Sequence, residues 1–194
     1  RLRHDIKHHL IAILGLAKHE NSVRTAGYVK TLLEEWTYSE QKIRISGNSV
    51  VDSLLAYYRE QAGEYHVRFE CEAKLPEDLP FEAGRLTVIL GNLLDNALEG
   101  SRKVENAWIL VRASYEKGVL FLNIRNICEP KQLKLCDEKY ITTKTDSENH
   151  GYGLKSVEQA VEAYKGSMTV ECKDNVFDVT LVLFQKSDMQ TSFL

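Results

Sequence analysis

The chain has 194 residues, of which 43% are apolar and 27% are charged, and its formal net charge is −3. This composition is ordinary for a globular protein and supplies enough apolar side chains for a core. The slightly acidic balance offers no basic field for nucleic acid, and no apolar run approaches the roughly 18 residues of a membrane-spanning helix. No signal peptide is evident. Because the chain opens at Arg1 without a methionine, we expect it to be a fragment of a longer protein.

The four cysteines have no metal-binding or redox spacing, because no pair forms C-x-x-C. We interpret them as free thiols in a reducing cytoplasm. They are Cys71, Cys128, Cys136 and Cys172.

Two amphipathic helices are predicted at the N-terminus, over residues 1–19 and about 22–36, because apolar residues recur at helical spacing in both. A short connection makes them an antiparallel hairpin. A lone hairpin cannot bury both apolar stripes, so we expect a homodimer in which two hairpins form a four-helix bundle. We assign residues 1–40 to this region and residues 41–190 to a second domain, with a polar linker and hinge over residues 38–47.

The remaining sequence alternates between helical and strand patterns. Residues 65–73 alternate between apolar and polar side chains, which predicts a half-buried strand. The predicted helices are 48–62 (ended by Gly63), 82–101 and 152–165, and the strands are 65–73, 107–115, 119–126, 167–173 and 176–184. Residues 127–150 form a long polar loop. This order predicts an α+β fold with a mixed sheet and helices on one face.

Asparagine recurs on the polar side of the predicted helix 82–101, in Asn92-Leu93-Leu94-Asp95-Asn96. Asparagine is a mediocre helix former, and its carboxamide oxygen is a hard ligand suited to Mg²⁺ or phosphate-bound water. The alternative is a solvated polar face.

A glycine-rich turn, His150-Gly151-Tyr152-Gly153-Leu154, opens the helix that follows the long loop. Glycines let the backbone approach a ligand closely, and the N-terminus of a helix favours phosphate. The alternative is an ordinary turn into a helix.

The long loop carries Thr142-Thr143-Lys144, which supplies hydroxyls and one cation suited to a terminal phosphate. The alternative is a solvated lysine.

Taken together and in this order, the three motifs resemble the GHKL ATPase family over about residues 48–184. The resemblance implies a Bergerat-type α/β sandwich that binds ATP with Mg²⁺. It makes Asn96 the metal ligand, with Asn92 beside it, and places Thr143, Lys144, His150, Gly151, Gly153 and Leu154 around the nucleotide.

The resemblance also implies two contacts with the base. Thr180 on the last strand matches a position that often touches adenine. Asn126 stands where most members carry the aspartate of an Asp-x-Gly-x-Gly box, whose glycines are missing here. An asparagine can still accept a hydrogen bond from the adenine amino group, as a neutral group.

The segment that begins Arg3-His4-Asp5 and runs to Leu10 resembles the phosphoacceptor box of sensor histidine kinases of the peptide-pheromone quorum-sensing type. This implies that His4 accepts phosphate from ATP, that Asp5 orients its ring, and that a response regulator aspartate then takes the phosphate. An upstream membrane sensor is implied, with this part in the cytoplasm. His4 and His8 have the spacing of two zinc ligands, but no third ligand is evident.

Two other functions stay open. One is a nucleotide-binding phosphatase or pseudokinase module, which the missing glycines favour. The other is a GHKL serine kinase that acts as an anti-sigma factor, against which the histidine hairpin argues.

Overall fold

The computed structural model describes residues 13, 25, 27–29, 45–128 and 152–185. The chain divides into two compact units, Arg1–Gln41 and Lys42–Leu194. In the first unit the described residues Ile13, Thr25 and 27–29 are helical, and the rest of the predicted hairpin lies outside the described residues. None of the helices described is long and apolar enough to cross a membrane.

The described part of the second unit forms a mixed five-stranded sheet and three helices. In chain order these are α3 (Ser49–Glu64), β1 (Arg68–Lys74), α4 (Ala83–Ser101), β2 (Trp108–Glu116), β3 (Val119–Ile127), α5 (Tyr152–Glu162), β4 (Ser167–Lys173) and β5 (Val176–Phe184). The strand order is β1-β2-β3-β5-β4, with β1 parallel to β2 and the other pairs antiparallel. The predicted α+β fold is confirmed.

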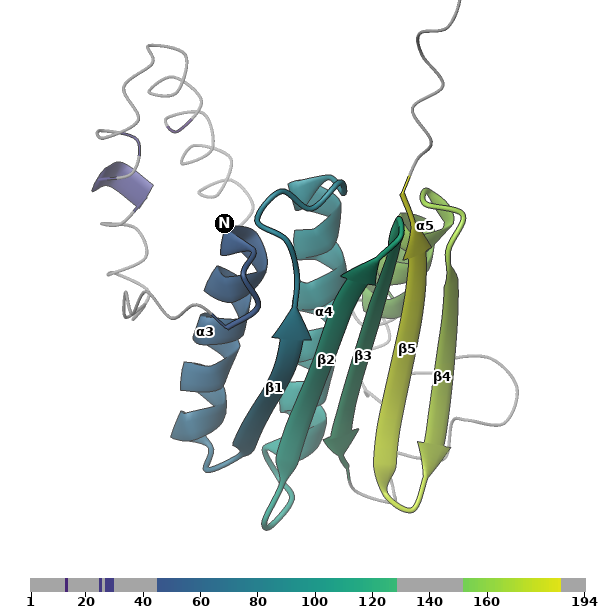
Figure 1. Cartoon of the computed structure of the whole chain (residues 1–194). Helices are drawn as coiled ribbons and strands as arrows, with labels where there is room; N and C mark the ends of the chain where they lie inside the picture. Colours follow the sequence, from purple (N-terminus) through teal and green to yellow (C-terminus); the bar gives the residue numbers. More distant parts are fainter. Residues whose placement is uncertain (1–12, 14–24, 26, 30–44, 129–151, 186–194) are drawn as a thin grey trace, which may run out of the picture. The chain divides into compact units, whose positions relative to one another are not determined.

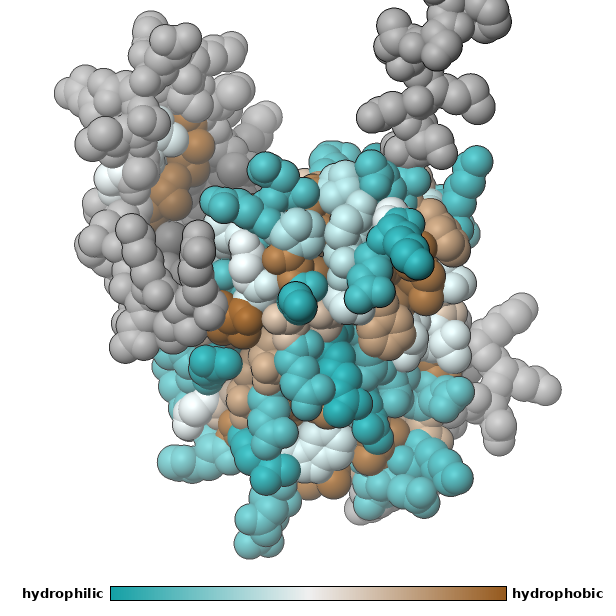
Figure 2. Space-filling model, viewed as in Figure 1, coloured by the Kyte–Doolittle hydropathy of each residue, from teal (hydrophilic) through white to brown (hydrophobic). Residues whose placement is uncertain are grey.

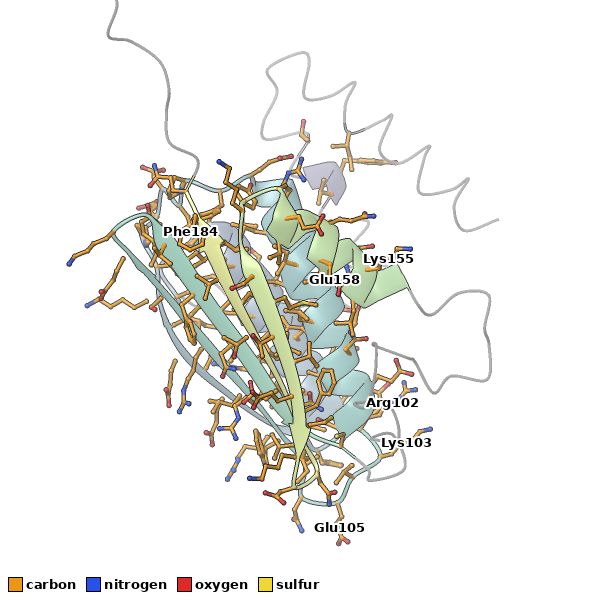
Figure 3. All side chains as sticks on the ribbon, turned by 90° about the vertical axis from the view of Figure 1, so that its right-hand side faces the viewer. Arg102, Lys103, Glu105, Lys155, Glu158 and Phe184 are labelled. Carbon is orange, nitrogen blue, oxygen red and sulfur yellow. The ribbon has the colours of Figure 1, made fainter. Side chains whose placement is uncertain are left out.

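All three helices cover the same face of the sheet (Figures 1 and 3). The central helix α4 lies between α3 and α5 and packs on β3 and β2, while α3 covers β1 and α5 covers β4 and β5. The buried residues of α4 are apolar except for Ser101 and recur at helical spacing, which is why this helix carries the core. Ile89 and Leu94 of α4, together with Leu181 of β5, have no exposed surface.

Both hairpin turns have the geometry that two-residue loops favour. Lys117 and Gly118 both have positive φ, and so do Asp174 and Asn175. Positive φ at both central positions defines the type I′ turn, whose twist matches that of the flanking strands. These turns join the strands predicted at 107–115 and 119–126 and those predicted at 167–173 and 176–184.

The structure moves the junction between α3 and β1. Gly63 lies inside α3, which continues to Glu64, and β1 begins only at Arg68. His66 adopts φ 57° in the turn between them. Tyr65 is 45% exposed, so the expected alternation fails at its first residue because that residue belongs to the turn.

Ser46 and Gly47, predicted as the end of a linker, are fixed to the second unit. Both the backbone N–H and the hydroxyl of Ser46 donate to Asp52 Oδ1 at 2.6 Å, and its carbonyl accepts from the Leu75 N–H at 2.8 Å. Gly47 has φ +102°, and an added Cβ would lie 2.6 Å from the Leu75 carbonyl oxygen. The linker predicted over 38–47 is therefore too long at its C-terminal end.

The cysteines within the described residues, Cys71, Cys128 and Cys172, form no disulfide, as predicted; Cys136 lies outside the described residues. Cys71 is on the helix-covered face of β1, and burial raises its pKa to about 11. At neutral pH this thiol is protonated and a poor nucleophile.

The described helices leave the other face of the sheet uncovered, and this face is largely hydrophilic (Figure 2). Its cross-strand neighbours include Arg112 and Glu72, whose side chains form an ion pair at 2.8 Å, and Arg125 and Asp178, which pair at 3.0 Å. Polar side chains therefore alternate with the buried apolar ones along the strands, as expected for a sheet with one covered face.

Candidate functional site

The middle of α4 meets the start of α5 at Asn92. Its Nδ2 donates to the carbonyl oxygen of Val88, one turn earlier, at 2.7 Å. A Cβ added at Gly153 would lie 3.1 Å from Asn92 Oδ1, so the backbone of α5 passes close to this oxygen. The structure therefore brings the asparagine motif and the glycine motif together, with the amide oxygen of Asn92 turned toward the first turn of α5.

Two further predicted residues lie beside this contact. Asn96 is one turn further along α4 and is half-buried. Leu154 is half-buried too and packs against the core, so it anchors the first turn of α5 to the domain. Carboxamide oxygens of this kind suit a hard cation that keeps most of its ligands from water and phosphate, which is how Mg²⁺ is bound beside nucleotides. Within the described ranges no cluster of three His, Cys, Asp or Glu side chains offers an all-protein metal site.

Asn126 lies on the helix-covered face of β3 and is only 2% exposed. Its Nδ2 donates to the carbonyl oxygen of Ile127 at 3.0 Å. Among the described residues no group donates to its Oδ1, so this oxygen remains an acceptor.

Asn92 and Asn126 lie at different heights along α4. The last residue of α4 is Ser101, whose hydroxyl lies near Asn126 because both contact the Ile127 carbonyl. Nine residues of helix separate Asn92 from Ser101, or about 13 Å at 1.5 Å per residue. Figure 3 shows Lys155, near the start of α5, and Arg102, after the end of α4, at different heights along the helices.

A tyrosine of α3 braces the asparagine motif from the other side of α4. The hydroxyl of Tyr58 donates to Asp95 Oδ1 at 2.8 Å and lies 3.2 Å from the carbonyl oxygen of Gly91. These two residues immediately precede Asn96 and Asn92. Burial and the bond to Asp95 raise the pKa of Tyr58 above its ordinary value, so the hydroxyl stays protonated as a donor. Sequence patterns did not find this pair, because the partners are 37 residues apart.

Removing the Tyr58 hydroxyl is expected to lower the free energy of unfolding by about 1 kcal/mol. A hydrogen bond to a charged acceptor contributes up to about 3 kcal/mol, and water replaces part of it because Asp95 is exposed. Urea unfolding of Tyr58→Phe measures the loss. Tyr115→Phe is the control, because it removes a hydroxyl that bonds the exposed Gln185 at 2.6 Å, and it should change stability by less than about 0.5 kcal/mol.

The hydrogen bond between Tyr58 and Asp95 also makes the free energy of unfolding depend on pH. Because the pKa of Tyr58 is raised in the folded state, its contribution is complete below the ordinary tyrosine pKa of about 10 and is lost as the pH rises beyond that value. The stability difference between the wild type and Tyr58→Phe should therefore shrink as the pH rises from about 9 to about 11, the range around that ordinary pKa. A difference that stays constant over this range would contradict the bond.

Thr180 is not part of this arrangement. Its neighbours Val179 and Leu181 are buried under the helices, so Thr180 lies on the opposite face of β5. There its hydroxyl accepts a hydrogen bond from Asn123 Nδ2 at 2.9 Å, and the same Nδ2 donates to Asp178 at 2.6 Å. The structure therefore separates Thr180 from Asn92 and Asn126 by the thickness of the sheet.

The other predicted site residues lie outside the described residues. They are His4, Asp5 and His8 near the N-terminus, and Thr143, Lys144, His150 and Gly151 before α5. Their predicted roles stay predictions.

Comparisons with known proteins agree with this fold. The family model described as the GHKL domain matches residues 81–184, which is more than half of the chain. No curated protein matched the sequence.

Solved structures share the fold at low sequence identity. The catalytic domain of histidine kinase ThkA is 18% identical with a TM-score of 0.54, covering 70% of this chain and 90% of its own. The mycobacterial sensor histidine kinase MprB is 20% identical with a TM-score of 0.52, covering 70% and 93%. The Acinetobacter baumannii histidine kinase AdeS is 14% identical with a TM-score of 0.52, covering 95% and 98%. With the family match, the sheet and the paired motifs in agreement, the chain belongs to the GHKL domain family.

Proposed function

We propose that this chain is the core of a sensor histidine kinase, which binds ATP with Mg²⁺ and transfers the γ-phosphoryl group to His4. The observation that carries the nucleotide site is the approach of Asn92 Oδ1 to the backbone of Gly153. This contact joins a carboxamide oxygen that can face a cation to a helix start that can face phosphate. The buried acceptor of Asn126 supplies a position for the base.

In this proposal the site residues divide into those that bind the metal ion and those that border the phosphates. Asn96 would hold Mg²⁺, with Asn92 beside it, and the ion would neutralise phosphate charge; the amides at the start of α5 would border the phosphates. Thr143, Lys144, His150 and Gly151 are proposed to border the same phosphates, on the strength of the family resemblance alone. Thr180 is not proposed as a contact, because it lies on the other face of the sheet.

The transfer forms a bond between a ring nitrogen of His4 and the γ-phosphorus and breaks the bond from that phosphorus to the oxygen that bridges to the β-phosphate. ADP leaves with the electron pair. The attacking imidazole must be neutral, which it largely is near pH 7, and its other ring proton has to be lost. Asp5 is proposed to accept a hydrogen bond from that N–H and so to orient the attacking nitrogen.

The proposed setting of this reaction is two-component signalling. A receiver-domain aspartate of a response regulator would take the phosphoryl group from His4, and two hairpins would dimerise as a four-helix bundle. We place this part of the protein in the cytoplasm, below an upstream membrane sensor of the peptide-pheromone quorum-sensing type. The resemblance of residues 3–10 to that phosphoacceptor box supports this assignment.

Incubation with γ-labelled ATP and Mg²⁺ tests the proposal in the wild type, His4→Gln and Asn96→Ala. We expect acid-labile label on the wild type and none on either variant. Asn96→Ala should also lose Mg²⁺-dependent ATP binding in calorimetry, whereas His4→Gln should keep it because the histidine is not part of the nucleotide site.

Other outcomes assign other functions. A wild type that binds ATP and stays unlabelled would indicate the pseudokinase or phosphatase module. Acid-stable phosphate on a separate protein would indicate the serine kinase. Label that persists in His4→Gln would move the acceptor, with His8 the first candidate.

A further inference from the structure

Four apolar side chains lie together on the face of the sheet that the described helices leave uncovered. Leu120 of β3 and Leu183 of β5 are paired and buried under the helices, so the residues on either side of them point to the other face. These residues are paired as well, and opposite side chains of an antiparallel pair lie about 5 Å apart. They form an apolar block that consists of Val119, Phe121, Val182 and Phe184.

The apolar block is exposed and has polar neighbours. Phe121 is 37% exposed and Phe184 is 45% exposed, and they are two of the four large apolar side chains exposed in the described part of the chain. The register places Ser114 of β2 and Ser167 of β4 beside the block, and Thr180 next along β5. Figure 2 shows apolar side chains gathered over β3 and β5 within the hydrophilic face, and Figure 3 labels Phe184. An apolar patch with a polar rim is typical of a contact site.

The apolar block is too small for a stable interface with a separate molecule. A fully buried aromatic side chain accounts for about 150–250 Å², and the two phenylalanines are less than half exposed. The block therefore offers roughly 300 Å², whereas a stable interface buries about 800 Å² on each partner. A segment of the same chain needs less area, because a short tether holds it at an effective concentration in the millimolar range.

The chain itself leads such a segment to the block. Gln185 follows Phe184, and its N–H donates to the Gly118 carbonyl at 2.7 Å. Its side-chain oxygen accepts a hydrogen bond from the Tyr115 hydroxyl at 2.6 Å. Both bonds hold Gln185 at the β2–β3 turn, directly beside the first residue of the block, so residues 186–194 start at its edge.

The sequence of residues 186–194 suits the block in composition and in length. It begins Lys-Ser-Asp, in which serine and aspartate favour a turn, and continues with Met189, Phe193 and Leu194 among polar residues. The block is two residues deep along each strand, or about 7 Å. Four extended residues span up to about 14 Å, so Met189 and the residues after it can reach the whole block once the chain has turned.

We propose that residues 187–194 dock on the apolar block, with Met189 and Phe193 against Phe121, Val182 and Phe184. A methionine side chain adapts to irregular surfaces and makes favourable contacts with aromatic rings, and two aromatic rings attract each other edge to face. The docking does not depend on the proposed nucleotide site, because that site lies on the helix-covered side of the sheet.

Fluorine NMR of the full chain, made with fluorinated phenylalanine, tests the docking ring by ring. The chain has six phenylalanines, and single replacements by leucine assign their signals. In the double variant Met189→Ser/Phe193→Ser we expect the signals of Phe121 and Phe184 to shift toward those of solvent-exposed rings. Phe69 packs against the core on the helix-covered face, so its signal should stay in place and serves as the reference.

The reciprocal experiment changes the block and follows the ring of Phe193. Val182→Ser should shift the Phe193 signal, because it removes apolar surface from the block. Thr180→Ser is the matched control, since it removes one methyl group from the same face of β5 outside the block. Within the tail, Gln190→Ser is the control and should leave the signals of the block unchanged.

Two results would overturn the docking. One is a pair of signals from Phe121 and Phe184 that are the same in the wild type and in Met189→Ser/Phe193→Ser. The other is a wild-type spectrum in which these signals move on dilution, because a second copy would then cover the block. The proposed function is tested separately, and calorimetry should give the same ATP affinity for the double variant and the wild type.

Discussion

Replacing Gly153 with alanine is expected to weaken the binding of Mg²⁺ and ATP by about tenfold or more, while the free energy of unfolding stays unchanged or rises slightly. The new Cβ would lie 3.1 Å from Asn92 Oδ1, and Asn92 cannot easily retreat because its Nδ2 is bonded to Val88. Its carboxamide oxygen must therefore shift from its place beside α5, at the expense of the bond to Val88. Alanine in place of glycine favours a helix by up to about 1 kcal/mol, which offsets the crowding in the stability measurement.

The control for this experiment is Gly91→Ala, in the helix turn before Asn92. There the added Cβ would lie 3.9 Å from the Tyr58 hydroxyl, an ordinary contact. Gly91→Ala should raise stability by roughly 0.5–1 kcal/mol and leave ATP affinity unchanged. Calorimetric titration and urea unfolding of both variants measure the two effects. Equal ATP affinity in Gly153→Ala and Gly91→Ala would show that the contact between α4 and α5 does not position Asn92.

Replacing Gly166 with alanine is expected to lower the free energy of unfolding by about 3 kcal/mol, the upper end of the usual penalty for an overpacked position. The added Cβ would overlap the Val182 carbonyl oxygen of β5 and lie 2.9 Å from Leu183 Cδ2. Because the first of these atoms is backbone, relief requires the chain after α5 to move away from the sheet. Thermal and urea unfolding measure the loss.

Gly63→Ala provides the comparison for Gly166. Gly63 lies near the end of α3, and an added Cβ there meets no atom within 4 Å. We expect it to gain up to about 1 kcal/mol from helix propensity. Similar stabilities for the two alanine variants would mean that the backbone near Gly166 yields at little cost.

The local patterns of the sequence predicted the elements well, because each depends on neighbours along the chain. The alternation in β4 and β5 and the two turns with positive φ are properties of a few consecutive residues. The helix end predicted at Gly63 is two residues too early. The N–H groups of Tyr65 and His66 bond back to the carbonyl oxygens of Ala62 and Gly63 and so extend the last turn of α3. Helix ends are set by such capping bonds as much as by composition.

The site was predictable where a motif lies on one element and unpredictable where two elements meet. Asn92 and Asn96 share a helix face by spacing alone. Thr180 was placed by family position rather than by strand phase, and a shift of one residue moves a side chain to the other face of a sheet. Ser101 and Ile127 are 26 residues apart, so only the packing of α4 on β3 reveals their contact.

The hydrogen bonds from Ser46 to Asp52 and Leu75 fix the N-terminal end of the packed second unit. Ile45, just before them, already packs against the core, so it belongs to this unit as well. An extended residue spans at most about 3.5 Å, so three residues inserted before Ile45 would add up to about 10 Å of chain ahead of the second unit. The nucleotide site would keep its geometry, because the anchor isolates it from the insertion. The length of chain before Ile45 and the affinity for nucleotide can therefore change independently.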